Sequence, residues 1–302
     1  LTEMRYIVAL ARERHFGKAA EACHVSQPTL SVALKKVEGQ LGAALFERTA
    51  SDVRITALGE RIVAQARRVL EEAVRLEEIA GSGGDPMTGP LRVGVIYTIA
   101  PYLLPQLIPA LHRHAPAMPL FLKEDFTGNL IPALKAGELD VIVIALPFAE
   151  PGLVAQPVYE EPFRVVVPAA HAWVGRTDVA ADELDGENLL LLGQGNCFRD
   201  QVLESCPRLT APDALTHSLE GSSLETIRYM VASGAGVAVM PSTAADPLID
   251  REPMVRVLPF AGEQPARTVG LVWRVTFPRP QAIDAMRAAI LSCQLPGATA
   301  VR

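Results

Sequence analysis

A long helical pattern that ends in a glycine-rich break divides this chain of 302 residues into parts that must fold differently. From Ala57 to Ala80 the apolar residues recur at alternating spacings of four and three, which is one seam of a coiled coil. The seam residues are Ile62, Ala66, Val69, Ala73, Leu76 and Ala80. We therefore expect a dimerisation helix over residues 59–80, although such a helix can also pack on its own domain. The Gly- and Pro-rich stretch 81–90 predicts a hinge.

The segment before this helix has the pattern of a winged helix-turn-helix over residues 1–58. An apolar stripe predicts a first helix over residues 2–14, and small residues between Gly17 and Cys23 predict a short second one. Ser26 suits the N-cap of a third helix, because its hydroxyl can accept a hydrogen bond from a free helix amide. Residues 46–56 fit a two-stranded wing. Many small helical motifs bind proteins instead, so the pattern alone leaves the partner open.

If the partner is DNA, residues at the start of the third helix contact base edges while nearby basic groups hold phosphates. The candidate DNA-contacting residues are Ser26, Gln27, Pro28, Thr29, Ser31, Lys35, Lys36, Arg48 and Arg54. The charge distribution agrees with this interpretation. Residues 1–58 hold eight Lys/Arg against six Asp/Glu, whereas residues 59–302 hold twenty against twenty-eight, which together give the net charge of −6.

Strand and helix patterns alternate after the hinge, which predicts an α/β region of two lobes with largely parallel strands. We expect one lobe over residues 91–160 and 266–302 and the other over residues 161–265. Ligands in such folds bind where the strands end, between lobes. No apolar run reaches the roughly 20 residues that span a bilayer, and the charged first helix predicts no signal peptide. Four cysteines in such a chain indicate a reducing cytoplasm.

Cys197 and Cys206 lie nine residues apart across a predicted short helix. That spacing is ~13.5 Å of helical rise with the side chains on opposite faces, whereas a disulfide needs Cα atoms within about 7 Å of each other. If these thiols join, the segment must rearrange. The pair is either a redox-driven conformational switch or two unrelated thiols.

Two segments identify a resemblance to a known family. Residues 15–31, which read His-Phe-Gly-Lys-Ala-Ala-Glu-Ala-Cys-His-Val-Ser-Gln-Pro-Thr-Leu-Ser, together with Leu45-Phe46-Glu47-Arg48, resemble the N-terminal domain of LysR-type transcriptional regulators. The resemblance implies a winged helix-turn-helix, a linker helix and a two-lobed effector domain similar to periplasmic binding proteins. It also implies binding to double-stranded promoter DNA, assembly as a homotetramer and action on RNA polymerase.

Three further segments resemble the hydrogen-peroxide sensors of that family: residues 195–201 with Cys206, residues 98–105 and residues 267–272. In those sensors the first cysteine is oxidised to a sulfenic acid and the second condenses with it, so the resemblance gives these roles to Cys197 and Cys206. The residues that it suggests around the peroxide are Thr98, Thr127, Asn196, Arg199, Asp200 and Arg267.

One position departs from that pattern, because Asn196 stands where such sensors usually have histidine. A histidine can carry charge or move a proton, whereas asparagine can only donate and accept hydrogen bonds. We therefore expect slower oxidation or an altered pH dependence.

Two alternatives remain. In the first, a small organic effector binds between the lobes near Thr98, Thr127 and Ser222, and the cysteines are incidental. In the second, the chain is an enzyme, a thiol peroxidase or hydrolase, although it has no Gly-x-Ser-x-Gly elbow. We expect no enzyme activity, no cofactor and no structural metal, and we expect Cys23 and Cys293 to be small buried side chains.

Overall fold

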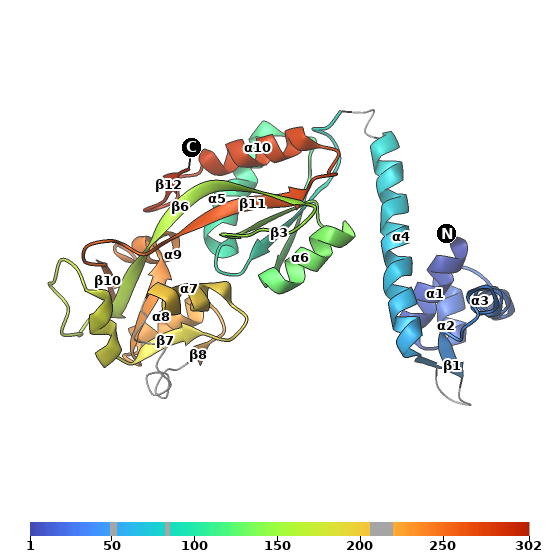
Figure 1. The fold of residues 1–302 in the computed structure, drawn as a ribbon, viewed down its shortest axis with the longest axis horizontal. Coiled ribbons are helices and arrows are strands. Elements are labelled where there is room, and N and C mark those ends of the chain that lie inside the picture. The colour runs from blue at the N-terminus through green and yellow to red at the C-terminus, as the bar shows by residue number, and fades with distance from the viewer. Residues whose placement is uncertain (49–52, 82–84, 206–219, 302) are drawn as a thin grey trace. The chain divides into compact units, whose positions relative to one another are not determined.

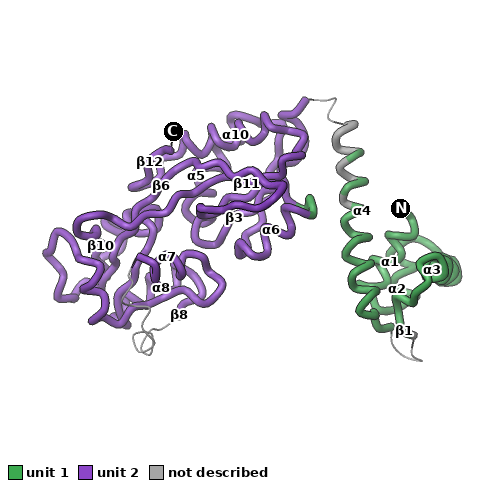
Figure 2. Tube along the Cα trace, in the orientation of Figure 1, with its two compact units in different colours: residues 1–84, 136–138 green, residues 85–135, 139–302 purple. Residues whose placement is uncertain are grey.

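The computed structural model describes residues 1–48, 53–81, 85–205 and 220–301 of the chain (Figure 1). The chain divides into two compact units, which Figure 2 distinguishes by colour. The N-terminal unit is residues 1–84 with 136–138, and the C-terminal unit is residues 85–135 with 139–302. Among the described helices, none has the length and apolar character needed to cross a membrane.

The N-terminal unit is a winged helix-turn-helix followed by a long helix. Its elements are α1 (Thr2–Glu13), α2 (Phe16–Ala22), α3 (Gln27–Leu41), β1 (Phe46–Arg48), β2 (Val53–Ile55) and α4 (Ala57–Gly81). The three short helices share a core that includes Ile7, Leu10, Leu30 and Leu34. The Ser26 side chain accepts a hydrogen bond from the Thr29 amide at 3.4 Å, as its predicted N-cap role requires. β1 and β2 pair antiparallel and form the two strands of the wing.

The two halves of α4 have different surroundings. Near its start, Val63 and Ala66 are buried within the N-terminal unit. Further along the predicted seam, Val69 is 37% exposed and Leu76 is 70% exposed. The first half therefore packs on its own domain, which was the alternative to dimerisation, whereas the second half leaves apolar side chains uncovered in the single chain.

The C-terminal unit is built on one mixed sheet. Its helices are α5 (Ala100–His114), α6 (Thr127–Ala136), the 3₁₀ turn η1 (Ala181–Gly186), α7 (Cys197–Ser205), α8 (Leu224–Ala232), α9 (Ser242–Ala245), the 3₁₀ turn η4 (Asp246–Leu248) and α10 (Pro280–Leu291). Its strands are β3 (Leu91–Ile96), β4 (Leu120–Asp125), β5 (Val141–Leu146), β6 (Leu153–Pro168), β7 (Leu189–Leu192), β8 (Glu220–Gly221), β9 (Val237–Pro241), β10 (Val255–Pro259), β11 (Ala266–Arg274) and β12 (Thr299–Ala300). The strand order is β4-β3-β5-β11-β6-β9-β7-β8, and β10 and β12 also pair with β6.

Two separate hydrophobic cores form on this sheet and define two lobes. The core of lobe 1 draws its residues from 91–159 and 269–290, and the core of lobe 2 from 163–260. The long strand β6 contributes Tyr159 to the first core and Phe163 to the second. Figure 1 shows β6 and β11 side by side along the unit, in agreement with their antiparallel register.

The expectation of largely parallel strands is wrong for the middle of this sheet. Pairs β3–β4, β3–β5, β7–β8 and β7–β9 are parallel, but β11 is antiparallel to both β5 and β6. The reason is the path of the chain. It leaves lobe 1 along β6 and returns along β11, so the two crossing strands must run in opposite directions.

The described part of the expected hinge, residues 85–90, is fixed to the C-terminal unit. The Arg279 guanidinium donates to the backbone carbonyls of Pro86, Gly89 and Pro90 at 2.9, 3.3 and 2.7 Å. The Gly89 amide also donates to the Ala117 carbonyl at 3.1 Å. These bonds make residues 85–90 a folded entry into β3 rather than a free linker.

Candidate functional site

Three loops that follow parallel strands bring the candidate residues of the C-terminal unit together. Thr98 follows β3, Thr127 is the first residue of α6 after β4, and Cys197 is the first residue of α7 after β7. The carboxyl ends of parallel strands are the usual ligand sites of α/β sheets, because helices begin there with free amide groups. Two of these loops come from lobe 1 and one from lobe 2, so the site lies between the lobes.

These loops line a small, partly open pocket with a cavity volume of about 10 Å³, enough for about one water-sized molecule. Its lining residues are Ile96, Tyr97, Thr98, Asp125, Phe126, Thr127, Gly195, Asn196 and Cys197. The Cys197 sulfur is partly buried and lies 4.0 Å from the Thr127 hydroxyl. The predicted residues Thr98, Thr127, Asn196 and Cys197 therefore line one pocket.

A buried polar network lies behind Thr98. Arg267 on β11 donates to the Thr98 hydroxyl at 2.8 Å and to the Thr98 carbonyl at 3.0 Å. Its guanidinium also pairs with Glu161 at 2.7 Å, and both of these side chains are 0% exposed. The second Glu161 oxygen accepts a hydrogen bond from the Thr243 hydroxyl at 2.6 Å. Because Thr98 lies in lobe 1 and Thr243 in lobe 2, this network joins the lobes.

Phe198 connects that network to the helix that carries the cysteine. The Arg267 guanidinium carbon lies 5.1 Å from the centre of the Phe198 ring, within the range of a cation–π contact. The same ring meets Phe163 edge to face at 5.1 Å. The first turn of α7 is therefore held from two sides at the residue next to Cys197.

Asn196 precedes α7 as a buried residue, 9% exposed. Its side-chain amide donates to the Gly193 carbonyl at 3.0 Å. Gly195 has a backbone φ of +90°, a left-handed conformation that favours glycine. Asn196 thus both lines the pocket and closes the turn that leads into α7.

Arg199 and Asp200 lie away from the pocket lining. Arg199 donates to the Leu192 carbonyl and pairs with Glu220, both at 2.8 Å. Asp200 is exposed on α7. Positions 197 and 199 are about 200° apart around a helix axis, so Arg199 cannot face the same side as the thiol.

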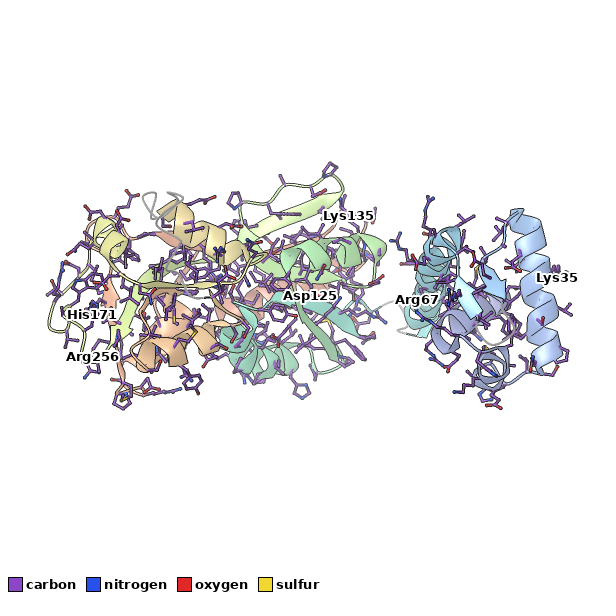
Figure 3. All side chains as sticks on the ribbon, turned by 90° about the horizontal axis from the view of Figure 1, so that it is seen from below. Lys35, Arg67, Asp125, Lys135, His171 and Arg256 are labelled. Carbon is purple, nitrogen blue, oxygen red and sulfur yellow. The ribbon has the colours of Figure 1, made fainter. Side chains whose placement is uncertain are left out.

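Asp125 brings a negative charge to the pocket wall, and Figure 3 labels its position within the C-terminal unit. A hydrogen bond from the Asn129 side chain is the main cause that lowers the pKa of this carboxyl, assisted by the Phe126 amide and Lys123. Asp125 is therefore ionised at neutral pH. Sequence reasoning did not identify it.

Of the three other cysteines, Cys206 lies outside the described residues. Cys23 and Cys293 are partly buried free thiols, and burial raises the pKa of both. A raised pKa leaves little thiolate at neutral pH, so these two are poor nucleophiles. Both side chains are only half-buried, so the expectation that they are small buried side chains is wrong.

Most of the candidate DNA-contacting residues are exposed in the N-terminal unit. Gln27, Pro28, Thr29, Lys35, Lys36 and Arg54 are exposed, and Ser31 is half-buried. Figure 3 shows Lys35 on α3, at the outer edge of its unit. The Ser26 and Thr29 hydroxyls lie 2.8 Å apart, so capping engages both of them. Arg48 lies on β1, and its side chain is outside the described part of the chain.

Sequence reasoning missed Glu161, Thr243 and Phe198. The alternation Tyr159, Glu161, Phe163 in β6 points all three inward, and this alternation was the available signal for a buried carboxylate.

Family models match both units of the chain. Residues 1–60 match the model described as "Bacterial regulatory helix-turn-helix protein, lysR family", and residues 84–293 match "LysR substrate binding domain". These matches agree with the expected fold class, an N-terminal winged helix-turn-helix with a two-lobed α/β region.

Similar proteins and solved structures cover nearly the whole chain. The "DNA-binding transcriptional dual regulator OxyR" of Escherichia coli K12 is 41% identical over 290 residues, which are 96% of this chain and 94% of that protein. A full-length OxyR structure from Pseudomonas aeruginosa, with one cysteine replaced by aspartate, is 51% identical with a TM-score of 0.75 and covers 100% of this chain and 98% of that one. A Corynebacterium glutamicum OxyR structure, a cysteine-to-serine mutant with hydrogen peroxide bound, is 32% identical with a TM-score of 0.65 and covers 96% of this chain and 90% of that one.

Proposed function

This chain belongs to the LysR family of bacterial regulatory helix-turn-helix proteins, and we propose that it is a transcriptional regulator that senses hydrogen peroxide through Cys197. The observation that carries the proposal is the position of this thiol, at the start of α7 in a pocket of about 10 Å³ between two lobes. Hydrogen peroxide has only two heavy atoms, so a small pocket favours it over an organic effector.

In the first step, the Cys197 thiolate attacks one peroxide oxygen and the O–O bond breaks. The product is a sulfenic acid on Cys197, and the leaving hydroxide takes up a proton to become water. The Thr127 hydroxyl, 4.0 Å from the sulfur, is placed to donate a hydrogen bond to the thiolate or to the peroxide.

In the second step, the thiol of Cys206 attacks the sulfenic sulfur, and water leaves as the disulfide forms. Cys197 begins α7, which ends at Ser205, directly before Cys206. A nine-residue helix holds its two ends too far apart for a disulfide. Helix α7 must therefore unwind in part before the bond can close, and the contacts of Phe198 with Arg267 and Phe163 restrain its first turn. We propose that this rearrangement is the signal.

The DNA-binding part of the proposal rests on the exposed polar and basic residues of α3 and on the family. We propose promoter DNA as the partner, a homotetramer as the assembly and RNA polymerase as the target of activation, in a cytoplasmic setting. The uncovered apolar residues Val69 and Leu76 on α4 support pairing of linker helices.

Two observations argue against a small organic effector at this site. The pocket has room for about one water-sized molecule. Arg267, the cation that would bind an acidic effector, is already paired with Glu161 and bonded to Thr98. The match of both units to models of a regulator family argues against the second alternative, an enzyme.

Thiol mapping tests the proposal. The reduced full-length protein is treated with one equivalent of peroxide, and its thiols are mapped by mass spectrometry. We expect a Cys197–Cys206 disulfide in the wild type and in the matched control Cys293→Ser. We expect a stable sulfenic acid on Cys197 in Cys206→Ser. Equal oxidation of Cys23, Cys197 and Cys293, or no disulfide in the wild type, would overturn the proposal.

A further inference from the structure

The third helix of the N-terminal unit exposes two large apolar side chains, Val32 near its middle among polar residues and Leu41 at its last position. Val32 on α3 is 69% exposed, whereas Leu30 and Leu34 on the same helix are 0% and 1% exposed. Single exposed apolar residues are common on protein surfaces, so exposure alone decides nothing. The position of Val32 on the helix is what distinguishes it.

Val32 lies at the middle of the exposed face of α3. It is about 160° around the helix axis from Leu30 and Leu34, which point into the core. Pro28 and Lys36 lie four residues to either side of it, on the same face, and both are exposed. Lys35, three residues on, lies at the outer edge of the unit in Figure 3. An apolar group therefore stands at the centre of a polar, positively charged helix surface.

The major groove of DNA contains an apolar group that an exposed apolar side chain such as Val32 can contact. In the major groove, base edges present hydrogen-bond donors and acceptors, together with one apolar group, the thymine 5-methyl. Gln27 and Ser31 can satisfy the polar edges, and Lys35 and Lys36 suit phosphates. The Val32 side chain has no polar atom, so a methyl group is the feature of a base edge that it can recognise favourably.

We propose that Val32 is a specificity-determining residue that contacts the 5-methyl group of one thymine in each DNA half-site. The inference rests on the proposed DNA-binding function and adds to it the identity of the base that Val32 contacts. Ala in place of Val32 removes the two γ-methyl groups that extend toward the base, and it does not disturb the helix, because the side chain is exposed and alanine has the higher helix propensity.

Thymine-to-uracil substitution tests this directly, because uracil lacks only the 5-methyl group. The probe is a duplex selected by the full-length reduced protein from a random-sequence pool, with each thymine replaced in turn. For the wild type we expect one thymine in each half-site whose replacement weakens binding about four-fold, the effect of losing one buried methyl group. In Val32→Ala the same replacement should have no effect.

Two controls separate this contact from others on α3. Leu41→Ala shortens the other large exposed apolar side chain of α3, and we expect it to keep the wild-type uracil profile. Lys35→Ala should weaken binding to all duplexes alike and lower the salt dependence of binding. An unchanged uracil profile in Val32→Ala, a loss of discrimination in Leu41→Ala instead, or a wild-type protein whose binding is weakened by replacement of no thymine overturns the inference while leaving DNA binding intact. Failure to enrich any duplex overturns both proposals.

Discussion

Replacing Glu161 by glutamine is expected to destabilise the C-terminal unit strongly, because it leaves the Arg267 cation buried without a counter-charge. The two side chains are 2.7 Å apart and both 0% exposed. Removing one partner of a buried ion pair costs about 3–5 kcal/mol. Glutamine keeps one oxygen that can accept from Arg267, so we expect a loss near the lower end, about 3 kcal/mol. For a unit of this size that lowers the midpoint of thermal unfolding by roughly 10 °C.

The matched control is Glu183→Gln, which breaks a different arginine–carboxylate pair. Arg176 donates to both Glu183 oxygens at 2.6 and 2.8 Å, but the two side chains are 38% and 36% exposed. Exposed ion pairs contribute little to stability. Calorimetry of the reduced proteins should therefore show a small shift for Glu183→Gln and a large one for Glu161→Gln. Equal shifts would refute the reasoning.

A double variant separates stability from positioning. Methionine at both Glu161 and Arg267 replaces the pair by apolar groups, which is often neutral for stability. Its midpoint of thermal unfolding should lie closer to that of the wild type than the midpoint of Glu161→Gln does. The double variant nevertheless lacks the hydrogen bonds from Arg267 that fix Thr98. We expect this variant to fold normally and to be oxidised by peroxide more slowly than the wild type, as followed by stopped-flow. A wild-type oxidation rate would show that the network does not position the pocket.

Three further experiments test other parts of the chain. Phe198→Leu removes the ring beside Arg267, so we expect a loss of about 1–2 kcal/mol and faster disulfide closure in quenched-flow experiments; unchanged closure would show that the ring is no restraint. Burial raises the pKa of Cys23 and Cys293 above the ordinary 9.0. Alkylation of these two thiols, followed by mass spectrometry, should therefore be slow at neutral pH and accelerate only as the pH rises beyond that value; rapid alkylation at neutral pH would contradict this. Asn196→His should speed peroxide oxidation or add an inflection near the histidine pKa of about 6.5, whereas equal rates across pH would remove any role for this position.

The elements with strong local patterns were predictable from sequence. The start of α3 at Gln27 follows from the Ser26 cap, and α7 (Cys197–Ser205) lies where a short helix is predicted between the two cysteines. These elements depend on short-range hydrogen bonds and apolar spacing, which the sequence displays. The strands β10 and β11 and the first half of β6 were not predicted. They are defined by their pairing with strands far away in sequence.

The site shows the same division between local and distant information. The resemblance to peroxide sensors grouped Thr98, Thr127, Asn196 and Cys197, and the structure brings these four together. It also suggested Arg199 by its closeness in sequence, but helix geometry turns that side chain toward Glu220. Glu161 was missed because its role depends on partners 82 and 106 residues away. Contacts between residues so far apart in the sequence cannot be predicted from local spacing.

Footprinting on promoter DNA, with and without peroxide, determines whether oxidation of Cys197 reaches the DNA-binding unit. The wild type, Cys197→Ser and the control Cys293→Ser are compared as full-length proteins on one duplex. We predict that peroxide changes the protected half-sites for the wild type and Cys293→Ser and leaves those of Cys197→Ser unaltered. A Cys197→Ser protein whose footprint still responds to peroxide like the wild type would contradict the proposal.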